Sequence, residues 1–237
     1  MKKTILSVIC LMYGIAALAQ SVDGFQLGSY YSNSQILSML RRARTVNADN
    51  GYQIFISGNS SFSFDFTGAY ESNDGRFVDV DICDANHVLE FPFGSFRVGD
   101  NLSSLFMKRA GFVFSGYDSN VCRIYYTARS SKNSILLQFG AGQAITEISG
   151  FTSEKVKKDK NDVSRNGFFN SVTEIDVNGE SLGAGNSVGR ILQLGLDVDF
   201  TGLGNGICKI SFVSGNKEKS YLVRYGMDGI IKEILAI

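Results

Sequence analysis

The sequence predicts an α+β protein made of tandem α-β-β-β units, with room for a fourth strand in each. Its short helices are expected to pack on one face of an antiparallel sheet. Residues 99–151 align without a gap on residues 185–237, with 11 identities in 53 pairs, where chance supplies roughly three or four. Glycine, phenylalanine and tyrosine are abundant and proline occurs once, which is typical of short strands joined by tight turns.

The first 19 residues have the pattern of a signal peptide. Lys2 and Lys3 precede an apolar run over 4–17, and Ala17-Leu18-Ala19 fits the small-x-small cleavage rule. An apolar run of roughly 15 residues is shorter than the ~20 that span a bilayer, so export is favoured over a membrane-anchoring helix. We expect cleavage near Ala19, no membrane span in the mature chain, and a periplasmic or secreted protein.

Each matched segment is predicted to begin with a helix of around ten residues. Apolar residues recur there at the i, i+3, i+4 spacing of one buried stripe, after a residue type that caps helices. The caps are Asn101 and Ser187, and the stripes are Leu102, Leu105 and Phe106 in one segment and Val188, Ile191 and Leu192 in the other.

Three strands are predicted to follow each helix, because apolar and polar residues alternate there. Gly140 and Gly226 start the tight turn before the third strand. A short fourth strand fits at 112–114 and at 198–200. The three main strands span 121–127, 134–139 and 144–149 in one segment, and 207–213, 220–225 and 230–235 in the other.

A diverged first unit is predicted over residues 20–95, ahead of units at 96–152 and 171–237. Phe64-Asp65-Phe66-Thr67-Gly68 is similar to Val198-Asp199-Phe200-Thr201-Gly202. The helix of this first unit has a stripe of Ile36, Leu37 and Leu40, with Asn33 or Ser34 as its cap. Its predicted strands are 52–57, 61–67, 76–82 and 87–91. Residues 153–170 carry mixed charges, which favours a solvated linker or hairpin over a contact arm for an acidic partner.

Charge and cysteine content restrict the partners and the cross-links. Removal of Lys2 and Lys3 leaves 21 basic against 23 acidic residues, so nucleic acid is not an expected partner. Three cysteines remain, Cys83, Cys122 and Cys208, and an odd number leaves at least one thiol unpaired. About four strands at ~4.8 Å spacing would separate Cys122 from Cys208, so buried thiols are favoured over a disulfide.

Residues suited to catalysis are sparse. His87 is the only histidine, and no second ligand accompanies it at the spacing of a zinc site. A structural role is favoured, and a secreted hydrolase that uses His87 with a nearby acid or serine is the alternative. No cofactor or metal is expected, since the glycine-rich 183–189 lacks the P-loop lysine. Asp79, Asp81 and Asp84 lack the glycine and glutamate of an EF-hand.

The sheet face turned away from the helices is the predicted binding surface. If Cys122, Ile124 and Tyr126 face the helices, their neighbours point the other way. Tyrosine and arginine are frequent anchors of protein interfaces, whereas a solvated face with cross-strand ion pairs is the alternative. The candidate residues are Arg123, Tyr125, Gln138, Lys209 and Arg224.

An aliphatic residue and a glycine lead into each of the first two predicted helices. Leu27-Gly28 precedes Ile36 and Leu40, and Val98-Gly99 precedes Leu102 and Phe106. In this pattern the chain resembles the β-lactamase-inhibitor-protein fold and the SmpA/OmlA-type outer-membrane assembly lipoproteins. It differs from them in lacking a lipobox and the inhibitors' disulfide pairs. The resemblance implies a binding module. Together with the duplicated unit, the signal peptide and the lack of a predicted catalytic cluster, it leads us to expect an exported, non-catalytic protein of the bacterial envelope that binds a protein or peptide. A purely structural envelope component is the remaining alternative.

Overall fold

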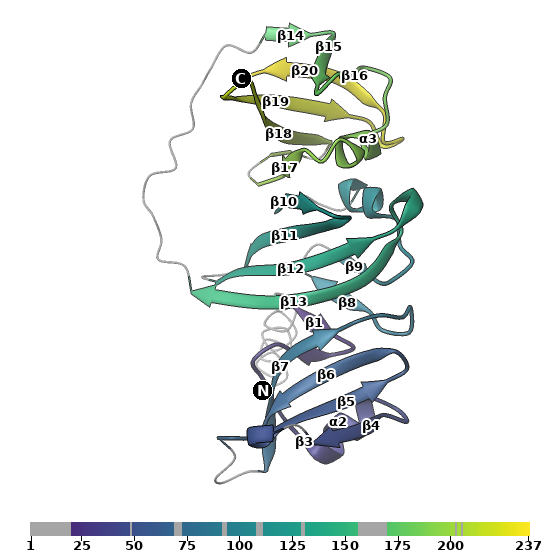
Figure 1. Ribbon diagram of the computed structural model, residues 1–237, viewed down its shortest axis with the longest axis vertical. Helices are drawn as coiled ribbons and strands as arrows, with labels where there is room; N and C mark the ends of the chain where they lie inside the picture. Colours follow the sequence, from purple (N-terminus) through teal and green to yellow (C-terminus); the bar gives the residue numbers. More distant parts are fainter. Residues whose placement is uncertain are drawn as a thin grey trace, which may run out of the picture. The chain divides into compact units, whose positions relative to one another are not determined.

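The computed structural model describes residues 20–47, 49–68, 73–91, 94–107, 111–128, 131–155, 170–201, 203–204 and 206–237. The predicted signal peptide and residues 156–169 of the predicted linker lie outside this range. No helix among the described residues is long and apolar enough to cross a membrane. The chain divides into two compact units (Figure 1). Unit 1 comprises the residues up to Gly99 with Thr146–Phe151, and unit 2 comprises Asp100–Ile145 with Thr152–Ile237.

Most of the described chain forms antiparallel strands, with only a few short helices, in agreement with the predicted α+β class. Unit 1 contains a four-stranded sheet of order β2-β1-β8-β9 and a five-stranded sheet of order β3-β7-β6-β5-β4. Its elements are β1 (Ser21–Val22), β2 (Phe25–Gln26), β3 (Tyr30–Ser32), α2 (Asn33–Met39), β4 (Arg44–Asn47), η1 (Asp49–Gly51), β5 (Tyr52–Ser57), β6 (Ser60–Asp65), β7 (Asp74–Asp81), β8 (Leu89–Phe91) and β9 (Gly94–Phe96).

A cluster of buried phenylalanine rings forms the core of unit 1. The ring centroid of Phe25 lies 5.6 Å from that of Phe64 and 5.7 Å from that of Phe77. The helix α2 begins one or two residues earlier than predicted, because Ser32 is its N-cap, rather than Asn33 or Ser34, and forms a capping box with Gln35. Ile36 of the predicted stripe is buried, whereas Leu37 is 46% exposed, so that part of the stripe was wrong.

Unit 2 contains most of a nine-stranded antiparallel sheet of order β13-β12-β11-β10-β17-β18-β19-β20-β14. A separate hairpin of β15 and β16 accompanies it. The elements of this part are η2 (Leu102–Met107), β10 (Phe112–Asp118), β11 (Val121–Ala128), β12 (Ser131–Phe139), η3 (Ala141–Gln143), β13 (Ile145–Lys155), β14 (Asn170–Val172), β15 (Glu174–Val177), β16 (Glu180–Gly183), α3 (Gly189–Gln193), β17 (Asp197–Asp199), β18 (Ile207–Ser214), β19 (Lys217–Tyr225) and β20 (Ile231–Ala236).

Local geometry recurs at the 86-residue offset. The strands β18 and β19 begin and end 86 residues after β11 and β12. The turn before the last strand also recurs, since the Gly140 N–H donates to the Ala144 carbonyl at 2.8 Å and the Gly226 N–H to the Ile230 carbonyl at 3.0 Å. Where β10 pairs with β17, Val113 lies opposite Asp199, its counterpart at the same offset. The two sets of strands therefore meet about a local two-fold axis.

The helices of unit 2 are shorter than the ten residues predicted. The segment η2 is a six-residue 3₁₀ helix and α3 has five residues, and Gly195, with a φ of +65°, ends the second. The predicted cap Asn101 accepts the Ser103 N–H at 2.8 Å. Ser187 accepts the Gly189 N–H at 3.2 Å, but the predicted cap was wrong by one residue, because the N-cap of α3 is Val188. These side chains satisfy donors that a helix start leaves unpaired.

The described cysteines are all free. Cys122 and Cys208 are fully buried, as expected of small apolar side chains, whereas Cys83 is exposed. Two strands, β10 and β17, lie between the strands that carry Cys122 and Cys208. The separation is therefore about three strand spacings of ~4.8 Å rather than four, and it still exceeds the reach of a disulfide.

Candidate functional site

The candidate site is the open face of the nine-stranded sheet, defined here as the face opposite the buried Cys122, Ile124 and Tyr126. The segment η2 packs on the buried side, where the Phe106 ring contacts Phe114 and Phe200. Because side chains alternate along a strand and the register pairs the strands directly, the predicted residues share the open face. They are Arg123 and Tyr125 on β11, Gln138 on β12, Lys209 on β18 and Arg224 on β19.

Three of the predicted residues lie on β11 and β12, and two of them, Arg123 and Tyr125, lie close together. The guanidinium carbon of Arg123 lies 6.0 Å from the ring centroid of Tyr125. Lys132, which the sequence analysis missed, places its Nζ 4.7 Å from the same centroid on β12. Two cations thus contact one aromatic ring, an arrangement that the ring quadrupole favours. Gln138 is exposed and pairs with Val121 at the end of the ladder.

Hydroxyl groups hold Arg123 in place. Its Nη1 donates a hydrogen bond of 3.1 Å to the Oγ of Ser134, which lies 2.7 Å from the Oγ1 of Thr152. Ser134 is 4% exposed, so this chain of contacts anchors the guanidinium from beneath. Alternation along β12 places Ser134 and Lys132 on the same face as Gln138. This alternation is the feature of the sequence from which both residues could have been predicted to lie on the open face.

The other two predicted residues lie across the local two-fold axis, apart from the first three. Lys209 is half-buried and directly opposite Asp199 in the register of β17 and β18. The Nη1 of Arg224 forms an ion pair of 3.1 Å with the Oε2 of Glu233 on β20. This half of the open face therefore carries the cross-strand charge pairing that the sequence analysis left as an alternative.

One row of paired residues crosses the open face and joins the two groups. It passes through all the strands from β12 to β14, with apolar side chains on either side of the adjacent Asp199 and Lys209. In order along the sheet, the row is Ser134, Tyr125, Val113, Asp199, Lys209, Leu222, Leu235 and Ser171. Sequence alone did not predict this row, because it depends on the long-range pairing of β10 with β17.

A cleft of about 600 Å³ lies beside Arg224 in unit 2. Its wall includes backbone and side-chain polar groups from three strands and from the loop before β18. The lining residues relevant here are Ser171, Thr173, Arg224, Tyr225, Lys232 and Glu233. The cleft has a size that accommodates a side chain or a small ligand.

His87 lies in unit 1 and is 5% exposed. Its Nδ1 is 2.6 Å from the Oδ2 of Asp23, and its Nε2 is 3.3 Å from the carbonyl oxygen of Ser57. Burial alone lowers the pKa of His87, but the Asp23 carboxylate, the Ser57 carbonyl and the charge of Asp84 raise it overall. Both ring nitrogens face acceptors, so the protonated ring can donate a hydrogen bond at each position. This environment fits the structural role that the sequence analysis favoured.

Neither a metal site among the described residues nor a known relative points to a further function for this chain. Among the residues that the structure describes, no group of three His, Cys, Asp or Glu side chains is placed to hold a metal ion. Asp79 and Asp81 lie within β7 rather than in a loop. In comparisons with protein-family models, curated proteins and solved structures, the chain matches none.

Proposed function

We propose that this chain is an exported, non-enzymatic protein of the bacterial envelope that binds a protein or peptide across the open face. The observation that carries the proposal is the cluster of Arg123, Lys132 and Tyr125, in which two cations contact one half-buried ring. Such a group offers a carboxylate two charged donors beside an apolar surface. No acidic side chain is paired with either cation among the described residues.

The scaffold proposed for this role is a tandem array of α-β-β-β units. Recurrence of strand ends and turn hydrogen bonds at the 86-residue offset supports two units in residues 96–152 and 171–237. A shared turn supports a diverged first unit at 20–95. The Oδ1 of Asp65 accepts from the N–H and hydroxyl of Thr67, and the Oδ1 of Asp199 does so from Thr201. The likeness to β-lactamase-inhibitor-type and SmpA/OmlA-type proteins fits this arrangement.

Site-specific photo-crosslinking tests the binding role directly. Benzoylphenylalanine is placed at Tyr125 on the open face and, as a matched control, at Met107, which is 49% exposed on η2. We expect adducts in intact cells from position 125 alone, and their loss when Arg123→Glu and Lys132→Glu are added. Equal adducts from both positions, or none from position 125, would contradict the proposal.

Export is tested separately. The proposal expects the protein in the periplasmic or culture fraction, with an N-terminus near Gln20 after cleavage at Ala19. N-terminal sequencing of the recovered protein reads the cleavage point. Recovery in the cytoplasmic fraction with Met1 retained would contradict the export, without bearing on the open face.

A further inference from the structure

One edge of the five-stranded sheet in unit 1 is open to solvent. This edge is β4, and all four of its residues, Arg44–Asn47, are exposed. On an edge strand, alternate residues direct their N–H and C=O groups away from the neighbouring strand, where another strand can pair with them. Val46 is 45% exposed and shares a face with Arg44, so the edge also offers an apolar contact.

Three arginines surround the start of this edge. Arg41 and Arg42 lie in the turn between α2 and β4, and Arg44 is the first residue of the strand. All three are exposed. Their guanidinium groups form no ion pair or hydrogen bond with the residues that the structure describes. The edge therefore presents uncompensated positive charge next to unpaired backbone groups.

Arg42 occupies a backbone conformation that does not favour arginine. Its φ is +64°, in the left-handed region that glycine and asparagine adopt most readily. Most other non-glycine residues with positive φ in this structure are Asn or Asp. Charged side chains on an edge strand can serve to block unwanted pairing, but Arg42 precedes the strand. Edge protection therefore does not account for an arginine at this position.

We propose that β4 binds an extended acidic peptide, which adds to the five-stranded sheet as a sixth strand. The peptide backbone pairs with the open edge, and its carboxylates meet Arg41, Arg42 and Arg44. Strand addition of this kind obtains affinity from main-chain hydrogen bonds and specificity from alternate side chains, and guanidinium groups pair well with carboxylates. The proposal concerns unit 1 and does not depend on the function proposed for the open face.

Fluorescence anisotropy with the full chain tests the proposal. The probe is a fluorescein-labelled peptide, Glu-Val-Glu-Thr-Glu-Val-Glu, and two control peptides carry lysine for glutamate or a methyl group on every backbone nitrogen. We expect binding of the acidic peptide alone, weakened at least tenfold between 50 and 500 mM salt. Equal binding of the lysine peptide or of the methylated peptide overturns the proposal, as does absence of binding by the acidic peptide.

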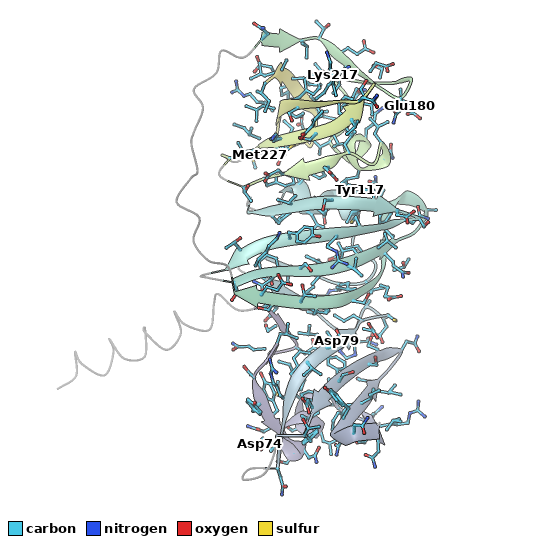
Figure 2. All side chains as sticks on the ribbon, turned by 60° about the vertical axis from the view of Figure 1, so that its left-hand side comes forward. Asp74, Asp79, Tyr117, Glu180, Lys217 and Met227 are labelled. Atoms are coloured by element: carbon cyan, nitrogen blue, oxygen red, sulfur yellow. The ribbon has the colours of Figure 1, made fainter. Side chains whose placement is uncertain are left out.

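Two variants separate peptide binding from folding. Arg42→Gly relieves the left-handed backbone at position 42, so we expect an unchanged or raised melting temperature together with binding weakened about threefold or more. Arg44→Glu should weaken binding at least tenfold. The matched control is Lys217→Glu, the same charge reversal at the exposed start of β19 in unit 2 (Figure 2), which should bind as the unmodified chain does.

Two further outcomes overturn the proposal. If Arg42→Gly and Arg44→Glu bind the acidic peptide as tightly as the unmodified chain, the arginines are not its site. If sedimentation without peptide shows a dimer that Arg44→Glu dissociates, the occupant of the edge is a second copy of the chain.

Discussion

The hydroxyl of Tyr225 donates a hydrogen bond of 2.7 Å to the backbone carbonyl oxygen of Phe106. The bond joins β19 to η2, and it satisfies a carbonyl near a helix end that has no partner within the helix. At the position 86 residues earlier the chain has Phe139, which has no hydroxyl. The equivalent hydrogen bond therefore cannot form in the other half of the sheet.

Loss of this bond should have a measurable effect on stability. We expect Tyr225→Phe to lower the free energy of unfolding by about 1 kcal/mol, because the Phe106 carbonyl loses its partner while the ring remains. Urea denaturation measures the difference. Tyr221→Phe on the same strand serves as the control, since Tyr221 contributes a ring stacked on Phe212. Equal effects of the two substitutions would show that the hydrogen bond contributes nothing.

The aromatic contacts at the local two-fold axis should dominate the stability of unit 2. Phe114 is fully buried, and its ring centroid lies 5.2 Å from that of Phe112 and 6.2 Å from that of Phe200. We expect Phe114→Ala to cost roughly 3–5 kcal/mol by opening a cavity. Met227→Ala is the control, because Met227 is 95% exposed (Figure 2) and should change the stability by less than about 0.5 kcal/mol. If Phe114→Ala lowered the free energy of unfolding by much less than this, Phe114 would not be a central residue of the core of unit 2.

The pair of His87 and Asp23 should make stability depend on pH. The folded-state pKa of His87 is raised above its ordinary value of 6.5. The stabilisation is therefore fully present below pH 6.5, and it is lost as pH rises through the raised pKa. Urea denaturation from pH 5.5 to 9 of the unmodified chain and of His87→Gln isolates the contribution. Their difference should shrink with rising pH.

Because the chain has a single histidine, its NMR titration reads the same pKa directly. A value at or below 6.5 would contradict the raised pKa. The same substitution tests the hydrolase alternative, since hydrolysis that is lost in His87→Gln, with the fold retained, would argue for catalysis.

The three described thiols should differ sharply in reactivity. Burial raises the pKa of Cys122 to about 12 and also raises that of Cys208, whereas Cys83 is exposed. Burial and the nearby carboxylates, Glu147 first among them, raise the pKa of Cys83 as well. Because the raised pKa leaves little thiolate at neutral pH, the thiolate fraction of Cys83 increases as the pH rises above 7. We expect N-ethylmaleimide to modify Cys83 alone in the native protein, faster at pH 8.5 than at pH 7. Peptide mass mapping identifies the modified residue.

Unfolding provides the control for this labelling. In urea, Cys122 and Cys208 should react as completely as Cys83, since burial is the only obstacle. Labelling of Cys122 or Cys208 at the rate of Cys83 in the native state would mean that the buried face of the sheet opens readily.

The strands that alternate regularly were predictable, and those that depend on distant partners were not. The strands β11 and β18 agree closely with the predicted 121–127 and 207–213 because one face is buried and the period is two. The hairpin of β15 and β16 was missed, although Asn178-Gly179, both with positive φ, is a strong signal for a two-residue turn. The lengths of the two helices in unit 2 were overestimated, because one or two turns are enough to bury Phe106 and Ile191.

The candidate site was predictable to a similar degree. Alternation along β11 and β18 was enough to place Arg123, Tyr125 and Lys209 on one face. It could not reveal that Lys132 reaches the Tyr125 ring, because that contact depends on the register between β11 and β12. The order of strands across the axis follows from long-range pairing, which leaves no local pattern in the sequence.

The pairing of Val113 with Asp199 has the geometry of an isologous dimer interface within a single polypeptide. Two identical chains meeting in this way would have to place the same side chain on both sides of the axis. Valine would then face valine, or aspartate would face aspartate at the cost of like-charge repulsion. A covalently joined pair is free of that restriction, so each side of the axis can vary alone. The middle of the open face can therefore be apolar on one side of the axis and acidic on the other. Because the two sides differ, an asymmetric ligand can bind there in a single orientation.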